Sequence, residues 1–199
     1  MKKLNFIIKY GLALLLLSFY SCESWLNVTP SDRLSEEMLF NDREGFVKAL
    51  NGVYIELNTN ELYGRNLTAG ALDVMGQYYS VASSSHAFYN YGGLVYTGND
   101  EKALFDNMWQ KCYAVIACCN TIIEKCDENK AGLSPVWKGS IKGEALALRA
   151  MLHFDMLRLF GPLTSELDKE SIPYQTNSDQ TVTPLLSGSE VVGLILADL

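Results

Sequence analysis

The sequence predicts an all-α fold whose central unit is a pair of long antiparallel helices. Residues 101–126 and residues 136–160 carry apolar side chains at helical spacing, and a short polar segment joins them. The second stretch ends at Gly161-Pro162, a strong helix stop. Such a pair is the unit of an α-solenoid or bundle, and Trp109 lies about one 34-residue tetratricopeptide-type repeat before the equivalent part of the second helix.

Shorter helices and long irregular loops are expected around this pair. Residues 35–56 carry apolar residues at helical spacing after an acidic first turn, and a short helix is expected to begin within residues 67–79. Residues 80–100 and residues 163–189 are irregular. Residues 189–199 are expected to form an amphipathic helix that ends without a cap or stop signal, so we expect the chain to be the N-terminal fragment of a longer protein.

The first residues have the layout of a secretory signal. Three lysines and no acid precede an apolar run at residues 10–19, which is shorter than the roughly 20 residues that span a bilayer. The run ends at Ser21-Cys22, and a small residue before a cysteine is the pattern that bacterial lipoprotein processing recognises. We therefore expect a signal peptide at residues 1–21, a membrane-anchoring lipid on Cys22 and an extended tether at residues 22–34. An ordinary secretory signal with an incidental cysteine is the alternative.

Charge and histidine content exclude several functions. The chain carries 16 basic and 23 acidic residues, a formal net charge of −7. Cleavage before Cys22 removes three lysines and no acid, which leaves 13 against 23, or −10. Nucleic acid and anionic lipid both need basic patches and are not expected as partners. With only His86 and His153, a histidine-based triad, a histidine-ligated metal site or another cofactor is not expected.

Four cysteines fall in the first long predicted helix. Cys112, Cys119 and Cys126 are seven residues apart and share a face. Seven residues of helix rise about 10.5 Å, whereas a disulfide needs Cα atoms within about 7 Å. Their spacing also differs from the CxxC pairs of zinc sites. We predict that these three and Cys118 are buried and act as small apolar residues.

Several motifs together resemble the SusD/RagB-type outer-membrane lipoproteins of Bacteroidetes. The most specific is Gly143-Glu144-Ala145-x-x-Leu148-Arg149-Ala150 before Phe160-Gly161-Pro162. The others are Cys22 with Trp25-Leu26, Ala49-x-x-Gly52-x-Tyr54, Trp109-x3-Tyr113-x2-Ile116-x3-Asn120, Ile172-Pro173 and the closing Ala197-Asp198-Leu199.

This resemblance implies an all-α fold of tetratricopeptide-like helix pairs, with residues 35–199 as the N-terminal helical domain. It implies a cell-surface lipoprotein of the outer membrane that covers a SusC-like TonB-dependent transporter. The ligand would be a polysaccharide or oligosaccharide, and the protein would not be an enzyme. The alternatives are a peptide-binding lipoprotein of the same fold, a purely structural helical scaffold and a secreted hydrolase whose catalytic part is missing. No carboxylate pair and no nucleophile with a base is recognisable for hydrolysis.

Aromatic side chains in the glycine-rich loop region are the candidate ligand-binding residues. Aromatic rings stack on the flat C–H faces of sugars, whereas amides and carboxylates bind hydroxyl groups. The alternative is that the rings pack the loop onto the helices or face the transporter. The candidates are Tyr78, Tyr79, Phe88, Tyr89, Asn90, Tyr91 and Tyr96.

The polar residues of the long helices are expected to be structural. Glu144 and Arg149 lie five residues apart and point about 140° away from each other, which argues against a catalytic pair. We expect both to be buried and to hydrogen-bond to neighbouring segments. Trp109, Tyr113 and Asn120 are expected to fix the interface between the paired helices.

Overall fold

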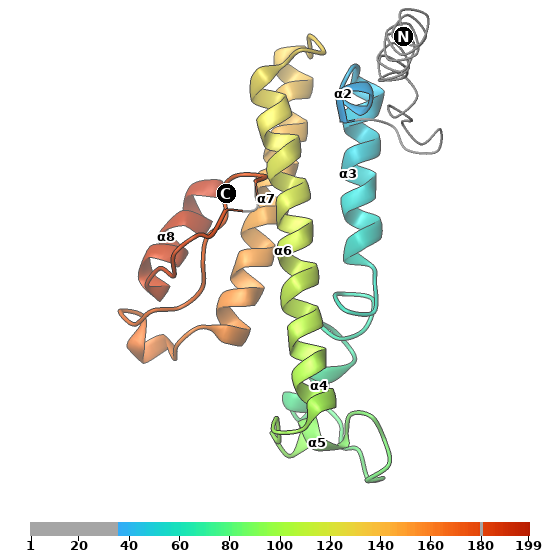
Figure 1. The fold of residues 1–199 in the computed structure, drawn as a ribbon, viewed down its shortest axis with the longest axis vertical. Coiled ribbons are helices and arrows are strands. Elements are labelled where there is room, and N and C mark those ends of the chain that lie inside the picture. Colours follow the sequence, from blue (N-terminus) through green and yellow to red (C-terminus); the bar gives the residue numbers. More distant parts are fainter. Residues whose placement is uncertain (1–35, 180) are drawn as a thin grey trace, which may run out of the picture. The chain divides into compact units, whose positions relative to one another are not determined.

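A pair of antiparallel helices forms the centre of the fold in the computed structural model, which describes residues 36–179 and 181–199. Helix α6 (Asn99–Glu128) packs along α7 (Pro135–Phe160) for most of its length (Figure 1). The predicted all-α fold with a long helix pair is therefore confirmed. The predicted signal peptide, Cys22 and the tether lie outside the described residues.

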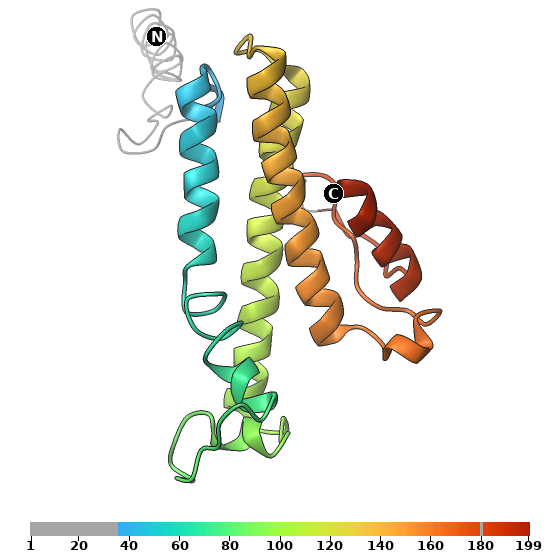
Figure 2. The same ribbon diagram turned by 180° about the vertical axis from the view of Figure 1, so that it is seen from behind.

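Two further helices flank the central pair. Helix α3 (Arg43–Leu57) packs along α6 on one side, and α8 (Gly188–Asp198) packs against α7 on the other, as both Figure 1 and Figure 2 show. In the described part of the chain no helix is both long enough and apolar enough to cross a membrane. The shorter elements are α2 (Glu36–Leu39), α4 (Ala71–Met75), α5 (Tyr89–Gly92) and the 3-10 turn η2 (Thr164–Glu166).

The reversal between α6 and α7 is fixed by local sequence. Asn129 ends α6 in the left-handed conformation, with φ 47°, which asparagine tolerates better than most residues. Its Oδ1 accepts a hydrogen bond from the Leu133 N–H at 2.7 Å. Ser134 then caps α7, and Pro135 occupies the first helical position, where no N–H is needed. The other end of α7 is closed by Gly161, as the Gly-Pro stop predicts.

The single helix predicted for residues 35–56 is wrong. The chain forms α2, turns at residues 40–42 and starts again as α3. Asp42 caps the new helix, because its Oδ1 accepts a hydrogen bond from the Gly45 N–H at 2.8 Å. A Cβ atom at Gly45 would lie 1.5 Å from the Leu39 carbonyl oxygen, so only glycine permits this close turn. The apolar spacing continues across residues 40–42, so the sequence pattern does not reveal the break between α2 and α3.

The core lies where α6 meets α3 and α7. Cys112, Cys119 and Cys126 are buried free thiols in this core, and burial raises the pKa of Cys112 and Cys119 to about 12. They therefore stay protonated and pack as small apolar groups. Cys118 is exposed, so its predicted burial is wrong. Consecutive helical positions point about 100° apart, and only the first three thiols share the inward face.

A buried ion pair joins α7 to α8. The Arg149 Nε and Nη2 atoms donate to the two carboxylate oxygens of Asp198 at 2.7 and 2.6 Å. Both side chains are at most 10% exposed. Arg149 Nη1 also donates to Asn120 Oδ1 on α6 at 2.8 Å, and the Tyr174 hydroxyl donates to Asp198 Oδ2 at 2.6 Å. The two charges thus have several hydrogen-bond partners, which a buried ion pair requires.

Side chains of the helix pair also hold the extended segment 171–179, which we call the strap. Asn120 Nδ2 donates to the Gln175 and Asn177 carbonyl oxygens at 3.1 and 2.8 Å. The Tyr113 hydroxyl on α6 donates to a third strap carbonyl, that of Pro173, at 2.8 Å. These bonds satisfy main-chain groups that would otherwise lack partners, because the strap has no helix or sheet of its own.

His153 on α7 provides a further contact with the strap. Its Nε2 accepts a hydrogen bond from the Gln175 N–H at 3.0 Å, so Nδ1 carries the proton and donates to the Arg149 carbonyl oxygen at 2.9 Å. The imidazole is fully buried and stacks on Tyr174 with ring centroids 3.9 Å apart. Burial lowers the pKa of His153 to about 4.

Replacing Arg149 by Met is expected to destabilise the protein by about 3–5 kcal/mol, because Asp198 is left as a buried, unpaired charge. Urea unfolding followed by circular dichroism measures the change. Arg158→Met is the matched control. Its guanidinium pairs with Asp155 but is 62% exposed, so the loss should stay below about 1 kcal/mol. Equal effects of the two substitutions would show that the buried pair contributes no more than a surface pair.

The buried imidazole also predicts a pH dependence. Because the folded state lowers the pKa of His153 from 6.5 to about 4, the unfolded chain binds the proton more tightly. The contribution of the neutral, buried imidazole to the free energy of unfolding is fully present above pH 6.5. It is lost as the pH falls towards 4, by about 3 kcal/mol in total. The free energy of unfolding of the protein and of His153→Gln should therefore converge over this interval. A constant difference between pH 7 and pH 4 would contradict the assignment.

Candidate functional site

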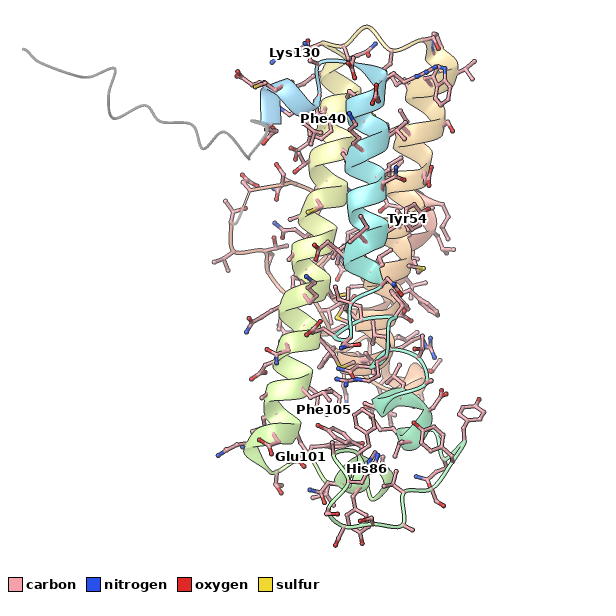
Figure 3. All side chains as sticks on the ribbon, turned by 90° about the vertical axis from the view of Figure 1, so that its right-hand side faces the viewer. Phe40, Tyr54, His86, Glu101, Phe105 and Lys130 are labelled. Atoms are coloured by element: carbon pink, nitrogen blue, oxygen red, sulfur yellow. The ribbon has the colours of Figure 1, made fainter. Side chains whose placement is uncertain are left out.

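An open groove of about 480 Å³ lies where α6 begins and α7 ends. The antiparallel pairing brings the first turns of one helix beside the last turn of the other, and α4 and the segment before α6 complete the walls. Figure 3 shows Phe105 and Glu101 at this end of α6 and Lys130 at the opposite end. The lining residues are Met75, Tyr96, Lys102, Phe105, Asp106, Leu159 and Phe160.

Three aromatic rings form the apolar part of the groove. Tyr96 meets Phe105 edge to face with centroids 5.4 Å apart, and Phe105 meets Phe160 in the same way at 6.3 Å. Behind them Trp109 packs on Phe160 at 5.0 Å. Edge-to-face contacts of this kind favour a fixed ring arrangement. Burial raises the pKa of Tyr96, so its hydroxyl stays protonated and can donate a hydrogen bond.

Two charged side chains complete the groove. Lys102 and Asp106 lie one turn apart on α6 and are both exposed. An ammonium group donates hydrogen bonds and a carboxylate accepts them. Together with the rings they offer a surface for a ligand that has flat apolar faces and several polar groups.

The loop between α4 and α6 is tied down at three points near the groove. Asn90 Nδ2 donates to Glu101 Oε1 at 2.7 Å, and this bond lowers the pKa of the Glu101 carboxyl. Gln77, which has φ 61°, donates from Nε2 to the Gly92 carbonyl oxygen at 2.8 Å. The Tyr79 hydroxyl donates to the Gly70 carbonyl oxygen at 3.2 Å. Side-chain hydrogen bonds, two of them to backbone carbonyl groups, therefore hold a segment that has little regular secondary structure.

The structure gathers few of the predicted ligand-binding residues around the groove. Tyr96 lines it, whereas Tyr91 is only 2% exposed and packs between Phe88 and Phe105. Tyr78 and Tyr89 are exposed, at 84% and 42%, whereas Tyr79 and Asn90 are held by the hydrogen bonds described above. A ligand site formed by all seven residues stays a prediction. The six that do not line the groove are Tyr78, Tyr79, Phe88, Tyr89, Asn90 and Tyr91.

Apolar periodicity does not single out the helical walls of the groove. Phe105 is one of many apolar residues at helical spacing within residues 101–126, and Phe160 is the residue before the Gly161-Pro162 stop. One signal could have found them, since antiparallel pairing places the start of one helix beside the end of the other. Aromatic residues at both positions then face a common space. Nothing in the periodicity distinguishes Lys102 and Asp106 from other exposed helix residues.

The residues predicted to be structural lie at contacts between helices. Glu144 is half-buried and accepts a hydrogen bond from the Tyr54 hydroxyl on α3 at 2.6 Å, which raises the pKa of Tyr54 to about 12. Arg149 points to the opposite side of α7, towards α8 and the strap. Trp109 packs between Phe160 and Tyr113, with centroid distances of 5.0 and 4.8 Å. Glu144 is thus not buried as expected, and the structural roles of these residues stay a prediction.

Comparison with known proteins places these features in a family. Residues 24–191 match the SusD-like family model described as "Starch-binding associating with outer membrane". The chain belongs to the SusD-like family. The fold agrees, because a SusD superfamily protein from Bacteroides thetaiotaomicron superposes with a TM-score of 0.60 at 20% identity. That alignment covers 79% of this chain and 36% of the other.

Curated SusD-like relatives come from Formosa agariphila. SusD-like protein P38 is 27% identical over 196 residues, which covers 90% of this chain and 33% of the relative. SusD-like protein P2 is 25% identical over 166 residues, covering 81% of this chain and 30% of the relative. The SusD-like chain described here therefore spans about a third of the length of these relatives.

Proposed function

We propose that this SusD-like protein captures glycans at the cell surface and delivers them to a SusC-like TonB-dependent transporter. The observation that carries the proposal is the aromatic groove at the start of α6. It is supported by the match to a family described as starch-binding and associating with the outer membrane. Lipid attachment at Cys22 would hold the protein at the outer membrane, as its N-terminal sequence predicts.

The chemistry of the groove suits sugar rings. Tyr96, at 36% exposure, offers a ring and a hydroxyl donor at the groove surface. Sugar C–H faces pack on such rings, and hydroxyl groups find an acceptor in Asp106 and a donor in Lys102. The groove lining contains a single carboxylate, whereas glycoside hydrolysis takes two. Binding without catalysis is therefore the proposed activity.

Binding of the full-length protein carrying Cys22→Ser to a panel of polysaccharides and peptides, measured by calorimetry, tests the proposal. Tyr96→Ala should weaken binding to the recognised glycan by about tenfold or more, because it removes a stacking surface. Trp137→Ala is the matched control, since Trp137 is 42% exposed but lies in the first turn of α7, at the opposite end from the groove. Tyr89→Ala measures the contribution of the loop.

Two outcomes would contradict the proposal. Saturable binding of peptides only would assign a different ligand class to the same fold. Glycan binding that Tyr96→Ala leaves intact would place the site elsewhere. Co-purification of the lipidated protein with a SusC-like barrel from outer membranes tests the transporter partnership separately.

A further inference from the structure

Lys102 stands apart from the other lysines of the described residues. Residues 36–179 and 181–199 contain eight lysines. Seven of them have a carboxylate oxygen within 4.0 Å of the ammonium nitrogen. Within the same residues Lys102 has none, although this part of the chain is rich in acids. An ammonium group that is left free at the edge of an aromatic groove is available to a ligand.

Of the residues that the structure describes, neither Glu101 nor Asp106 forms an ion pair with Lys102. Glu101 is 7% exposed and is held by Asn90 Nδ2 at 2.7 Å. Asp106 lies at the i+4 position of the same helix, a spacing at which lysine and aspartate can pair. Lys102 and Asp106 nevertheless form no ion pair within the described residues, and both line the groove. The two charges can therefore contact different parts of one ligand.

We propose that the groove recognises glycans with an anionic substituent, a uronate carboxylate or a sulfate ester, through Lys102. This inference rests on the proposed glycan-binding function and specifies its substrate class. An anionic group gains charge–charge attraction to the ammonium in addition to the hydrogen bond, whereas a neutral hydroxyl gains only the hydrogen bond. The sugar rings lie against Tyr96, Phe105 and Phe160, and Asp106 accepts hydrogen bonds from hydroxyl groups.

The net charge of the protein makes the position of Lys102 decisive. The formal charge of −7 disfavours polyanions in general. At physiological ionic strength, however, charges act over a Debye length of about 8 Å, so a ligand in the groove interacts mainly with the groove's own side chains. Selectivity for an acidic glycan then depends on one residue and is lost when that residue loses its charge.

Matched ligands that differ only in charge test the inference on the full-length protein carrying Cys22→Ser. One pair is polygalacturonate and its methyl-esterified form, and the other is a sulfated galactan and its desulfated form. The charged member of one pair should bind about tenfold more tightly. Lys102→Gln should abolish this preference, because the affinity for the charged member falls to that for the neutral member. The pair that shows the preference distinguishes carboxylate from sulfate.

Lys130→Gln is the control, because Lys130 is 82% exposed and lies near the far end of α6. It should leave both members of each pair unaffected. If neutral and charged glycans bind equally, or Lys102→Gln changes nothing, the inference is overturned. Glycan binding that is sensitive to Tyr96→Ala would in that case uphold the proposed function. If no glycan binds at all, the proposed function fails and the inference with it.

Discussion

The buried pair of Arg149 and Asp198 is the interaction on which the outer part of the fold depends. Removing two charges from water is costly and is offset only when their remaining hydrogen-bonding groups are satisfied. Here Asn120 and Tyr174 provide those partners. Four segments, α6, α7, the strap and α8, each contribute one side chain. Because no single segment can satisfy the pair, they are held together as a unit.

A continuous series of ring contacts connects this buried pair to the groove. Neighbouring ring centroids are at most 6.3 Å apart, and most of the contacts are edge to face. The series begins in the segment before α6, continues between α6 and α7, and ends in the strap. The groove walls and the strap thus share one packed interior, and such interiors transmit strain. In order, the rings are Phe88, Tyr91, Phe105, Phe160, Trp109, Tyr113, His153 and Tyr174.

The sequence was sufficient for the helix pair but not for the groove. Apolar periodicity and the Gly161-Pro162 stop define α6 and α7, because both follow from local rules. Periodicity overlooked the break at Asp42, where a cap and a close glycine contact interrupt an otherwise continuous pattern. Periodicity likewise does not distinguish an inward thiol from its exposed neighbour Cys118.

The loop residues show why the site was harder to predict. An aromatic side chain in an irregular segment is either packed inside or presented to solvent, and composition does not separate the two. Tyr91 packs inside and Tyr78 projects outward, although both come from the same loop. Whether a ring of this loop is buried depends on its contact with Phe105. Phe105 lies further along the chain, on α6, so only folding brings the two rings together.

Most of the groove wall is helical, and this has a consequence for how related proteins can diverge. Phe105 and Phe160 are placed by two helices that pack along each other, whereas residues 77–95, which connect α4 to α6, contain only the short helix α5. Loops tolerate insertion and substitution better than packed helices do. Insertions and substitutions can therefore change the loop beside the groove while the two helix ends that carry Phe105 and Phe160 stay constant.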